Sequence, residues 1–227
     1  MVVAIFIIML ILFIVVDLIL KKEDRSIKET DKSIKSPIFL SPEKALREIP
    51  NESDRRYHPS HSWVLRSTGD LYYAGYDKFI TRVFPSDIRV SINPQIDEFV
   101  RQGEKIWSLH FNGHSITQLA PITGKIIDIN PAFKMEMALP SEKIEKSWIV
   151  KMKAFDIINE TNNLLNHDQA SLVNNMLMDS VVMNAEKGHY LNDGGVIDPA
   201  YIKNMDDNEW KEFVDRFFPY QAGIGNQ

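Results

Sequence analysis

The chain has no cysteine, which excludes several kinds of site at once. None of its 227 residues can contribute to a disulfide bond, a thiolate zinc site, an iron–sulfur cluster or a thiol nucleophile. The glycine spacings of a phosphate-binding loop and of a dinucleotide fingerprint are also missing. There is no excess of positive charge, because 31 acidic residues outnumber 26 basic ones. The net charge of about −5 therefore argues against nucleic acid as a partner.

The sequence contains no complete catalytic template. The segment Gly113–Thr117 (GHSIT) resembles a nucleophile elbow for three residues, but it lacks the final glycine and the strand-to-helix context. Asp206 and Asp207 suit helix capping better than an acid–base pair. Four histidines invite a metal interpretation, yet no carboxylate or cysteine stands at a spacing that completes a site: His58, His61, His110 and His114. We predict no enzyme, no metal and no cofactor, with these histidines in exposed turns and His61 as a structural part of the first strand.

The plainest positive signal is an apolar run at the N-terminus. Residues 2–20 are apolar apart from Asp17, and about 20 such residues span a bilayer as a helix. The run has neither the basic start nor the small-residue cleavage site of a secretory signal. Basic residues follow it, beginning with Lys21, Lys22 and Arg25. We predict an uncleaved transmembrane anchor over residues 1–20, with the rest of the chain in the cytoplasm.

The remaining chain divides into a linker, a β-rich domain and a helical end. Residues 21–54 are charged and weakly periodic, which is typical of a flexible linker. Residues 55–155 contain short β-like runs with Gly, Pro or Asn at the corners, as in a compact barrel or sandwich. Residues 156–227 change to helical patterning. The predicted class is α+β, mainly β.

Capping signals mark three helices in this part of the chain. Asp77 suits the N-cap of a short helix with apolar residues Phe79, Ile80 and Val83. Asn166 and Gln169 have the spacing of a capping box, for a helix that runs toward Glu186 and that Gly188 can end. The last helix is expected to start at Asp206 or Asp207 and to bury Trp210, Phe213, Val214 and Phe217.

Several segments in sequence order resemble one known family. The run YHPSHSWV from Tyr57, the strand GEKIWSL, the return APITGKIIDIN and the late Trp148 with Ile149, Val150 and Lys151 are similar to the glycine cleavage system H protein, a lipoyl-carrier family. Gly75 with the short helix after it fits the same pattern. The resemblance covers about residues 57–165 and implies a barrel-sandwich hybrid: two small sheets with a protruding hairpin.

The sequence departs from that family where the resemblance implies the cofactor. The family's lipoyl lysine lies eight residues before the proline of the return strand. Counting back from Pro121 gives Gly113, between Asn112 and His114, and a shift of one or two places finds no lysine. Asn112-Gly113 instead favours a two-residue hairpin turn. The family's Asp-Pro-Tyr-Gly stretch before the late tryptophan is also absent.

Several functional hypotheses follow. The first is a membrane-tethered, non-lipoylated H-protein-like domain that serves as a scaffold or docking subunit for protein partners. The second is a lipoyl-type group carrier of glycine cleavage or a related pathway, with another lysine such as Lys105 or Lys125 modified. A third, an export-system adaptor, would need a long helical hairpin that the sequence lacks. The predicted partner surface for the first consists of Phe111, Asn112, Gly113, His114, Trp210, Phe213 and Phe217, with packing of the last helix against the domain as the alternative.

Overall fold

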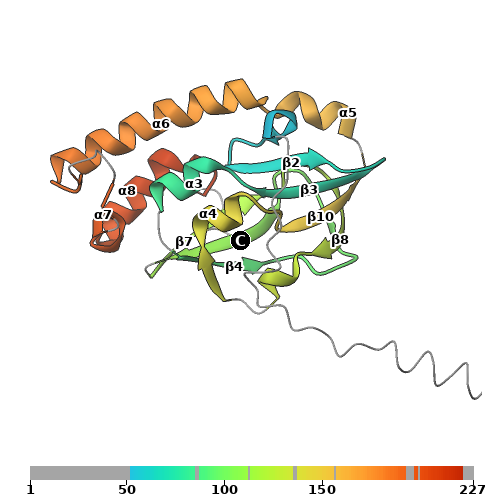
Figure 1. Cartoon of the computed structure of the whole chain (residues 1–227), viewed down its shortest axis with the longest axis horizontal. Helices are drawn as coiled ribbons and strands as arrows, with labels where there is room; N and C mark the ends of the chain where they lie inside the picture. Colours follow the sequence, from blue (N-terminus) through green and yellow to red (C-terminus); the bar gives the residue numbers. More distant parts are fainter. Residues whose placement is uncertain are drawn as a thin grey trace, which may run out of the picture. The chain divides into compact units, whose positions relative to one another are not determined.

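The computed structural model describes residues 52–84, 87–111, 113–134, 137–155, 157–192, 197–198 and 200–221. The predicted anchor and nearly all of the predicted linker lie outside these residues. Within the described part of the chain, no helix is both long and apolar enough to cross a bilayer. Figure 1 shows a domain built on β-strands, with the longest helix across one side.

Two antiparallel sheets form the body of the domain. The larger has the order β1-β2-β3-β10-β8-β5, with strands Arg56–Tyr57, Ser62–Arg66, Leu71–Tyr76, Val150–Ala154, Gly124–Ile129 and Phe99–Val100. The smaller has the order β7-β6-β4-β9, with strands His114–Leu119, Lys105–Phe111, Asp87–Ile92 and Ala138–Pro140. This architecture confirms the mainly β class predicted from the short, corner-bounded apolar runs.

One hydrophobic core draws on both sheets. Alternation along the strands sends Ile88 and Val90 of β4 inward, and both are almost completely buried, together with Trp107 of β6. The Trp107 indole Nε1 donates to Gln118 Oε1 of β7 at 2.5 Å. The Gln118 amide Nε2 in turn donates to the backbone oxygen of His61, at 3.0 Å, just before β2 of the other sheet. A buried, fully engaged amide thus fixes how the two sheets meet.

Helical elements surround this core. They are η1 (Glu52–Asp54), α3 (Lys78–Val83), η2 (Pro131–Phe133), α4 (Ser141–Glu145), α5 (Ile157–Glu160), η3 (Thr161–Asn163), α6 (His167–Lys187), α7 (Ala200–Lys203), α8 (Asp207–Phe217) and η4 (Pro219–Gln221). The three predicted N-caps are confirmed. Asp77 accepts from Phe79 N, while Asn166 and Asp206 each form a capping box with the residue three places on. Gly188 ends α6 as expected.

The C-terminal helices share the core of the sheets. Met178 and Val181 of α6 and Phe213 and Phe217 of α8 are buried in the same cluster as the strands. Of the residues expected on the inner face of the last helix, Trp210 and Val214 are partly buried. At the other boundary, Glu52 lies in the predicted linker but belongs to η1, and its carboxylate meets Lys78 Nζ at 2.6 Å. This contact joins η1 to α3.

Candidate functional site: the β6–β7 hairpin

The hairpin singled out by the sequence joins β6 to β7. Phe111 pairs with His114 across the turn, and Leu109 pairs with Ile116 one step below. Two residues therefore form the loop, as the Asn-Gly pair predicts. Gly113 has φ of +86°, a conformation that glycine adopts without the steric cost of a side chain. Asn112 lies outside the described residues.

The tip of this hairpin is open. Gly113 is exposed, and a Cβ built on it would meet no atom within 4 Å. A larger side chain therefore has room at this position, although the backbone conformation would be strained. The turn offers no amine nucleophile, because it contains only Asn112 and Gly113 between Phe111 and His114.

The base of the hairpin, in contrast, is packed. Phe111 is buried and stacks on Phe84 with ring centroids 3.9 Å apart. His114 is half-buried and stacks on Trp210 of α8, with centroids 4.3 Å apart and planes at 22°. Trp210 also meets Phe111 edge-on at 5.8 Å. The C-terminal helix thus covers the base of the hairpin with an aromatic side chain.

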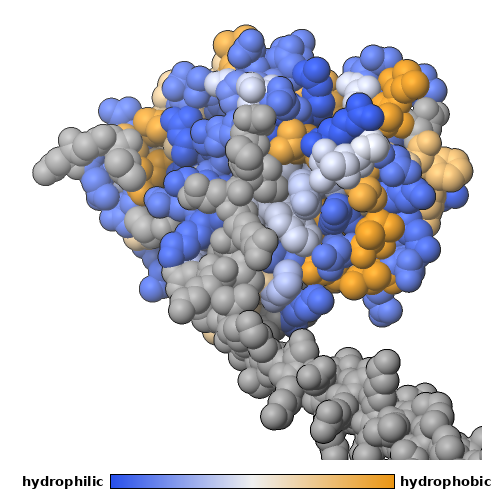
Figure 2. Space-filling model, turned by 45° about the vertical axis from the view of Figure 1, so that its right-hand side comes forward, coloured by the Kyte–Doolittle hydropathy of each residue, from blue (hydrophilic) through white to orange (hydrophobic). Residues whose placement is uncertain are grey.

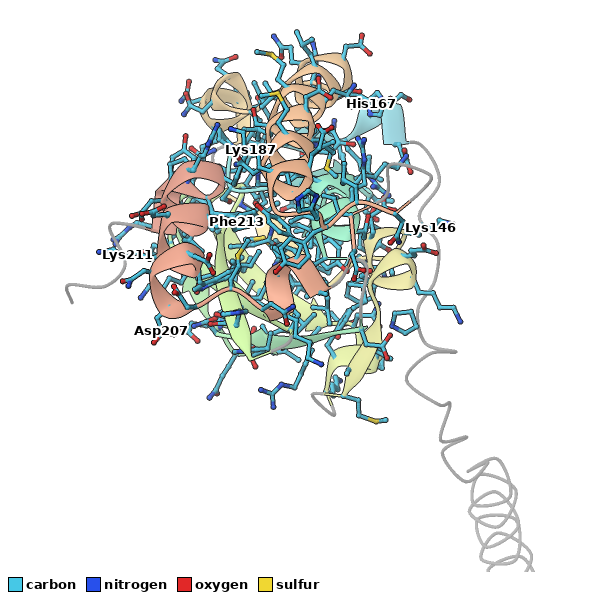
Figure 3. All side chains as sticks on the ribbon, turned by 90° about the vertical axis from the view of Figure 1, so that its left-hand side faces the viewer. Lys146, His167, Lys187, Asp207, Lys211 and Phe213 are labelled. Atoms are coloured by element: carbon cyan, nitrogen blue, oxygen red, sulfur yellow. The ribbon has the colours of Figure 1, made fainter. Side chains whose placement is uncertain are left out.

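Helix α8 reaches this position because its faces differ. Figure 3 looks onto this end of the domain: Asp207 and Lys211 lie on the outer side of α8, while Phe213 points toward the sheets. The ring centroid of Phe213 lies 6.3 Å from that of Phe84 and 4.9 Å from that of Phe217. The apolar residues of α8, which recur three and four positions apart, are thereby buried against the domain.

This packing corrects the predicted partner surface in part. Phe111, Phe213 and Phe217 are buried, with at most 4% of each exposed, so they belong to the core and present no surface. The alternative, packing of the last helix against the domain, describes Phe213 and Phe217, while Phe111 belongs to β6. Among the described residues of the predicted surface, Gly113, His114 and Trp210 keep exposed area, and their binding to a partner stays a prediction.

Sequence patterning missed two members of this cluster. Phe84 is the C-cap residue of α3, and Phe218 is the C-cap residue of α8. Their rings lie 6.0 Å apart and stacked, between the hairpin and α8. Each follows a helix and lies four residues after an apolar position, Ile80 and Val214, so extending the helical period by one residue past the helix end could have found them.

The lysines that could replace a tip lysine lie elsewhere. Lys125 stands on β8, paired across strands with Lys153 and Phe99, and its Nζ meets Asp97 at 2.8 Å. About half of its side chain is exposed. Lys105 is the first residue of β6, at the far end of the strand from the turn. Neither lysine is at the hairpin tip.

The histidines do not converge. Within the described ranges, no group of three or more potential metal ligands is close enough to hold an ion. The prediction of exposed turn histidines was wrong for His58, His110 and His114, which are all half-buried, with His110 in β6 and His114 in β7. The Nδ1 atom of His58 accepts from Ser60 N at 3.1 Å. Burial, aided by the nearby His61, lowers the pKa of His58 to about 4, so it is neutral at pH 7.

His61 has a structural position, as expected. It is buried with φ of +67°, stacks on Phe79 at 4.3 Å and places Nδ1 3.1 Å from Asp77 Oδ2. Asp77 also accepts from the Asn174 side chain of α6 at 2.9 Å, while its other oxygen caps α3. These contacts tie the start of β2 to two helices.

A cavity of about 340 Å³ opens beside α8, between it, α7 and the end of α6. Its wall includes the aromatic rings of Tyr190, Tyr201 and Phe213, with Glu212 and Arg216 among its polar residues. Burial raises the pKa of the Tyr201 hydroxyl, which therefore stays protonated. The lining contains no general base paired with a nucleophile, and this cavity does not suggest a reaction.

Apolar side chains also interrupt the polar surface on the side of the domain that carries α5 and β8 (Figure 2). Phe155 and Ile158 are about 80% exposed there, at 82% and 79%, and Phe99 of the edge strand β5 meets Phe155 at 5.9 Å.

Comparisons with known proteins agree with the hairpin architecture. A family model described as "Glycine cleavage H-protein" matches residues 55–176, which is more than half of the chain. The chain is 22% identical over 102 residues to the glycine cleavage system H protein of Clostridioides difficile (strain 630), covering 45% of this chain and 81% of that protein. It is 24% identical over 119 residues to the H protein of Staphylococcus haemolyticus (strain JCSC1435), covering 52% and 91%.

Among solved structures, a glycine cleavage system H protein from Mycobacterium marinum matches 55% of this chain and 99% of its own, at 16% identity and a TM-score of 0.40. The family match ends within α6, so α7 and α8 lie beyond it. On the family match over residues 55–176, the chain belongs to the glycine cleavage H-protein family.

Proposed function

We propose that this chain is a non-carrier member of the H-protein family that is held at a membrane and serves there as a docking or scaffold subunit. The observation that carries the proposal is the turn itself: the hairpin keeps its two-residue geometry and has no lysine. A lipoyl group is attached as an amide on a lysine ε-amine, and neither an asparagine nor a glycine supplies that nucleophile. The cofactor supplies a carrier's chemistry, so loss of the attachment point removes the activity.

The packing of α8 supports the same proposal. Trp210 covers the base of the hairpin, and the helix that carries it lies beyond the part of the chain matched by the family. A docking role can use a fixed surface, whereas a carrier must move a tethered group between sites. The remaining exposed residues at this end, Gly113, His114 and Trp210, are the proposed contact with a protein partner.

The membrane tether rests on the sequence alone. Residues 2–20 are long and apolar enough to span a bilayer, and the lysines that follow favour a cytoplasmic domain. Extraction of native membranes with alkaline carbonate should leave the full chain in the pellet. Protease added to inverted vesicles should then digest the domain, and protease added to sealed cells should not. Release of the chain by carbonate would refute the tether.

The family supports a second candidate, a lipoyl-type carrier modified at a different lysine. Lys125 is the specific candidate, because it is half exposed and follows the Pro-Ile-Thr-Gly corner. Its ion pair with Asp97 and its position within a sheet place the amine away from the hairpin tip.

The mass of the full chain from its native membrane, with peptide mapping, separates the two candidates. We expect an unmodified mass under conditions in which an H protein with its lysine, produced in the same cells, is fully modified. A lipoyl adduct on any lysine would overturn the non-carrier proposal. Disappearance of that adduct in Lys125→Arg, with Lys105→Arg as the matched control, would then assign the site.

A further inference from the structure

Helix α6 has two apolar faces, of which the domain covers only one. The inner face packs on the sheets and on α3 through Ala170, Met178, Val181 and Ala185, all buried. On the outer face, Leu172 is 64% exposed, Met176 63%, Met183 54% and Val173 40%. Figure 1 shows no described element over this outer side of α6. Four large apolar side chains in one stripe exceed what scattered surface residues explain.

Three of these side chains, Val173, Met176 and Met183, lie on a seven-residue repeat, and Leu172 flanks it. The positions of the repeat alternate by four, three, four, three and four residues, and they hold Gln169, Val173, Met176, Ser180, Met183 and Lys187. Such a 3–4 alternation is the seam of a two-helix coiled coil, where side chains of one helix insert between those of the other. The repeat extends over nearly the whole helix, which at 21 residues is about 30 Å long. The domain already holds α6 helical, so a partner helix gains the contact without ordering it.

The seam is complementary to itself when a second copy runs antiparallel. A two-fold axis at Met178 brings Val173 opposite Met183 of the other copy, and Met176 opposite Ser180. The outermost layer then pairs Gln169 with Lys187, close to Asp168 of the same helix end. In this one register Gln169 pairs with Lys187 at both ends, Val173 with Met183 in the next layers, and Met176 with Ser180 in the two central layers.

Charge selects the antiparallel arrangement over the parallel one. A parallel pair would place Lys187 against Lys187 and align the two helix dipoles, which repel. The antiparallel pair separates the lysines by the length of the helix and brings each toward the acidic first turn of its partner, at Asp168. Apart from Lys187, no basic residue of α6 lies beside the stripe. An anionic lipid surface therefore fits this face less well than a second copy of the helix does.

We propose that the outer face of α6 is a self-association surface, on which α6 of a second copy of this chain packs antiparallel. The apolar stripe is short, and the contact is below the size of a standard stable interface. The dimer is accordingly weak in dilute solution and depends on local concentration.

The absence of cysteine allows a clean test by disulfide formation in the full chain in detergent. Val173→Cys and Met183→Cys variants, with distinguishable tags, are mixed in equal amounts and allowed to exchange disulfides. Random pairing makes half of the linked dimers mixed, and we expect clearly more than half. Lys211→Cys, on the exposed side of α8, measures linkage from collision and from any association through the N-terminal run. Linkage no higher than in Lys211→Cys would overturn the proposal, and preferential linkage of each variant to itself would overturn the antiparallel register.

Three further substitutions separate a specific seam from non-specific hydrophobic association. Met176→Glu puts a charge at the centre of the seam without touching the core, and should reduce mixed linkage to the Lys211→Cys level. Met176→Leu is the matched variant that should retain it. Asp179 lies beside the two-fold axis and faces its own copy, so Asp179→Asn should strengthen association about twofold at low salt, the size of one like-charge pair on a helix surface. Unchanged linkage in Met176→Glu would refute the seam.

Discussion

Replacement of Trp210 by alanine tests whether α8 holds the base of the hairpin. The side chain is partly buried and contacts His114, Phe111 and Phe213. A tryptophan of this kind buries about 100 Å² of apolar surface, roughly half of its full contribution. At about 25 cal/mol per Å², that burial is worth about 2.5 kcal/mol. Loss of the stacked His114 contact adds about 0.5 kcal/mol, for a total near 3 kcal/mol in Trp210→Ala.

Urea unfolding of the full chain in detergent measures this loss. With a slope of about 3 kcal/mol per M, the midpoint should fall by about 1 M. Lys211→Ala, the next residue and exposed, should change the free energy of unfolding by less than about 0.5 kcal/mol. Hydrogen exchange adds a local readout, because the amides of β7 next to the turn should lose protection in Trp210→Ala alone. A loss below about 1 kcal/mol together with unchanged exchange would refute the argument that α8 stabilises the hairpin.

The remaining predictions concern glycine positions and a buried histidine. Gly75→Ala should cost at least about 3 kcal/mol, because its Cβ would stand 2.6 Å from the ring of Trp63, which is fully buried and fixed by a 2.6 Å hydrogen bond to Tyr76 O. Gly113→Ala, with φ of +86° and open space, should cost only about 1 kcal/mol, and the double variant Asn112→Lys with Gly113→Ala should remain folded in circular dichroism at a similar cost. Equal losses in Gly75→Ala and Gly113→Ala would contradict this contrast. The pKa of His58 is near 4 in the folded chain against 6.5 unfolded, so its neutral form stabilises the fold fully above pH 6.5. That contribution, about 3 kcal/mol at most, is lost as the pH falls from 6.5 to 4. His58→Gln should remove this part of the pH dependence in urea titrations, and parallel curves for the two proteins would show that His58 is not responsible.

Features specified by neighbouring residues could be predicted from the sequence. Asn166 and Gln169 are three residues apart, and their reciprocal hydrogen bonds need nothing from the rest of the chain. The same is true of Asp206 and of the Asn-Gly turn, where two residues determine the loop length. Such short-range signals identified the start of α6 and of α8 and the presence of the hairpin.

Features that depend on residues far apart in the chain could not be predicted from the sequence. The amphipathic pattern of α8 predicts that one face is buried, but it does not say which surface covers that face. The contact of Trp210 with His114 joins residues 96 positions apart, and Phe84 enters the same cluster from a third segment. His58 shows the same limit, since its ring lies 5.9 Å from the ring of Tyr220, near the other end of the domain's sequence. Polar residues in a turn look exposed until tertiary packing encloses them.

The hairpin has no lysine at its tip, and helix α8 covers its base. These two features differ in what they imply about function. Helix α8 covers the base at His114 and Phe111, while Gly113 at the tip stays open. Covering the base alone would still leave room for a modified side chain at the tip, so α8 does not exclude a carrier. In the proposed function, the absence of an amine from the turn, and not the position of α8, removes the carrier chemistry, because no rearrangement of the hairpin can create a nucleophile that the turn lacks. Once attachment is lost, nothing requires the base of the hairpin to stay accessible, and an aromatic cover that stabilises the domain costs no activity. Under the proposed function a covered base costs nothing, and the modification state of the chain, rather than the position of α8, decides between the two functions.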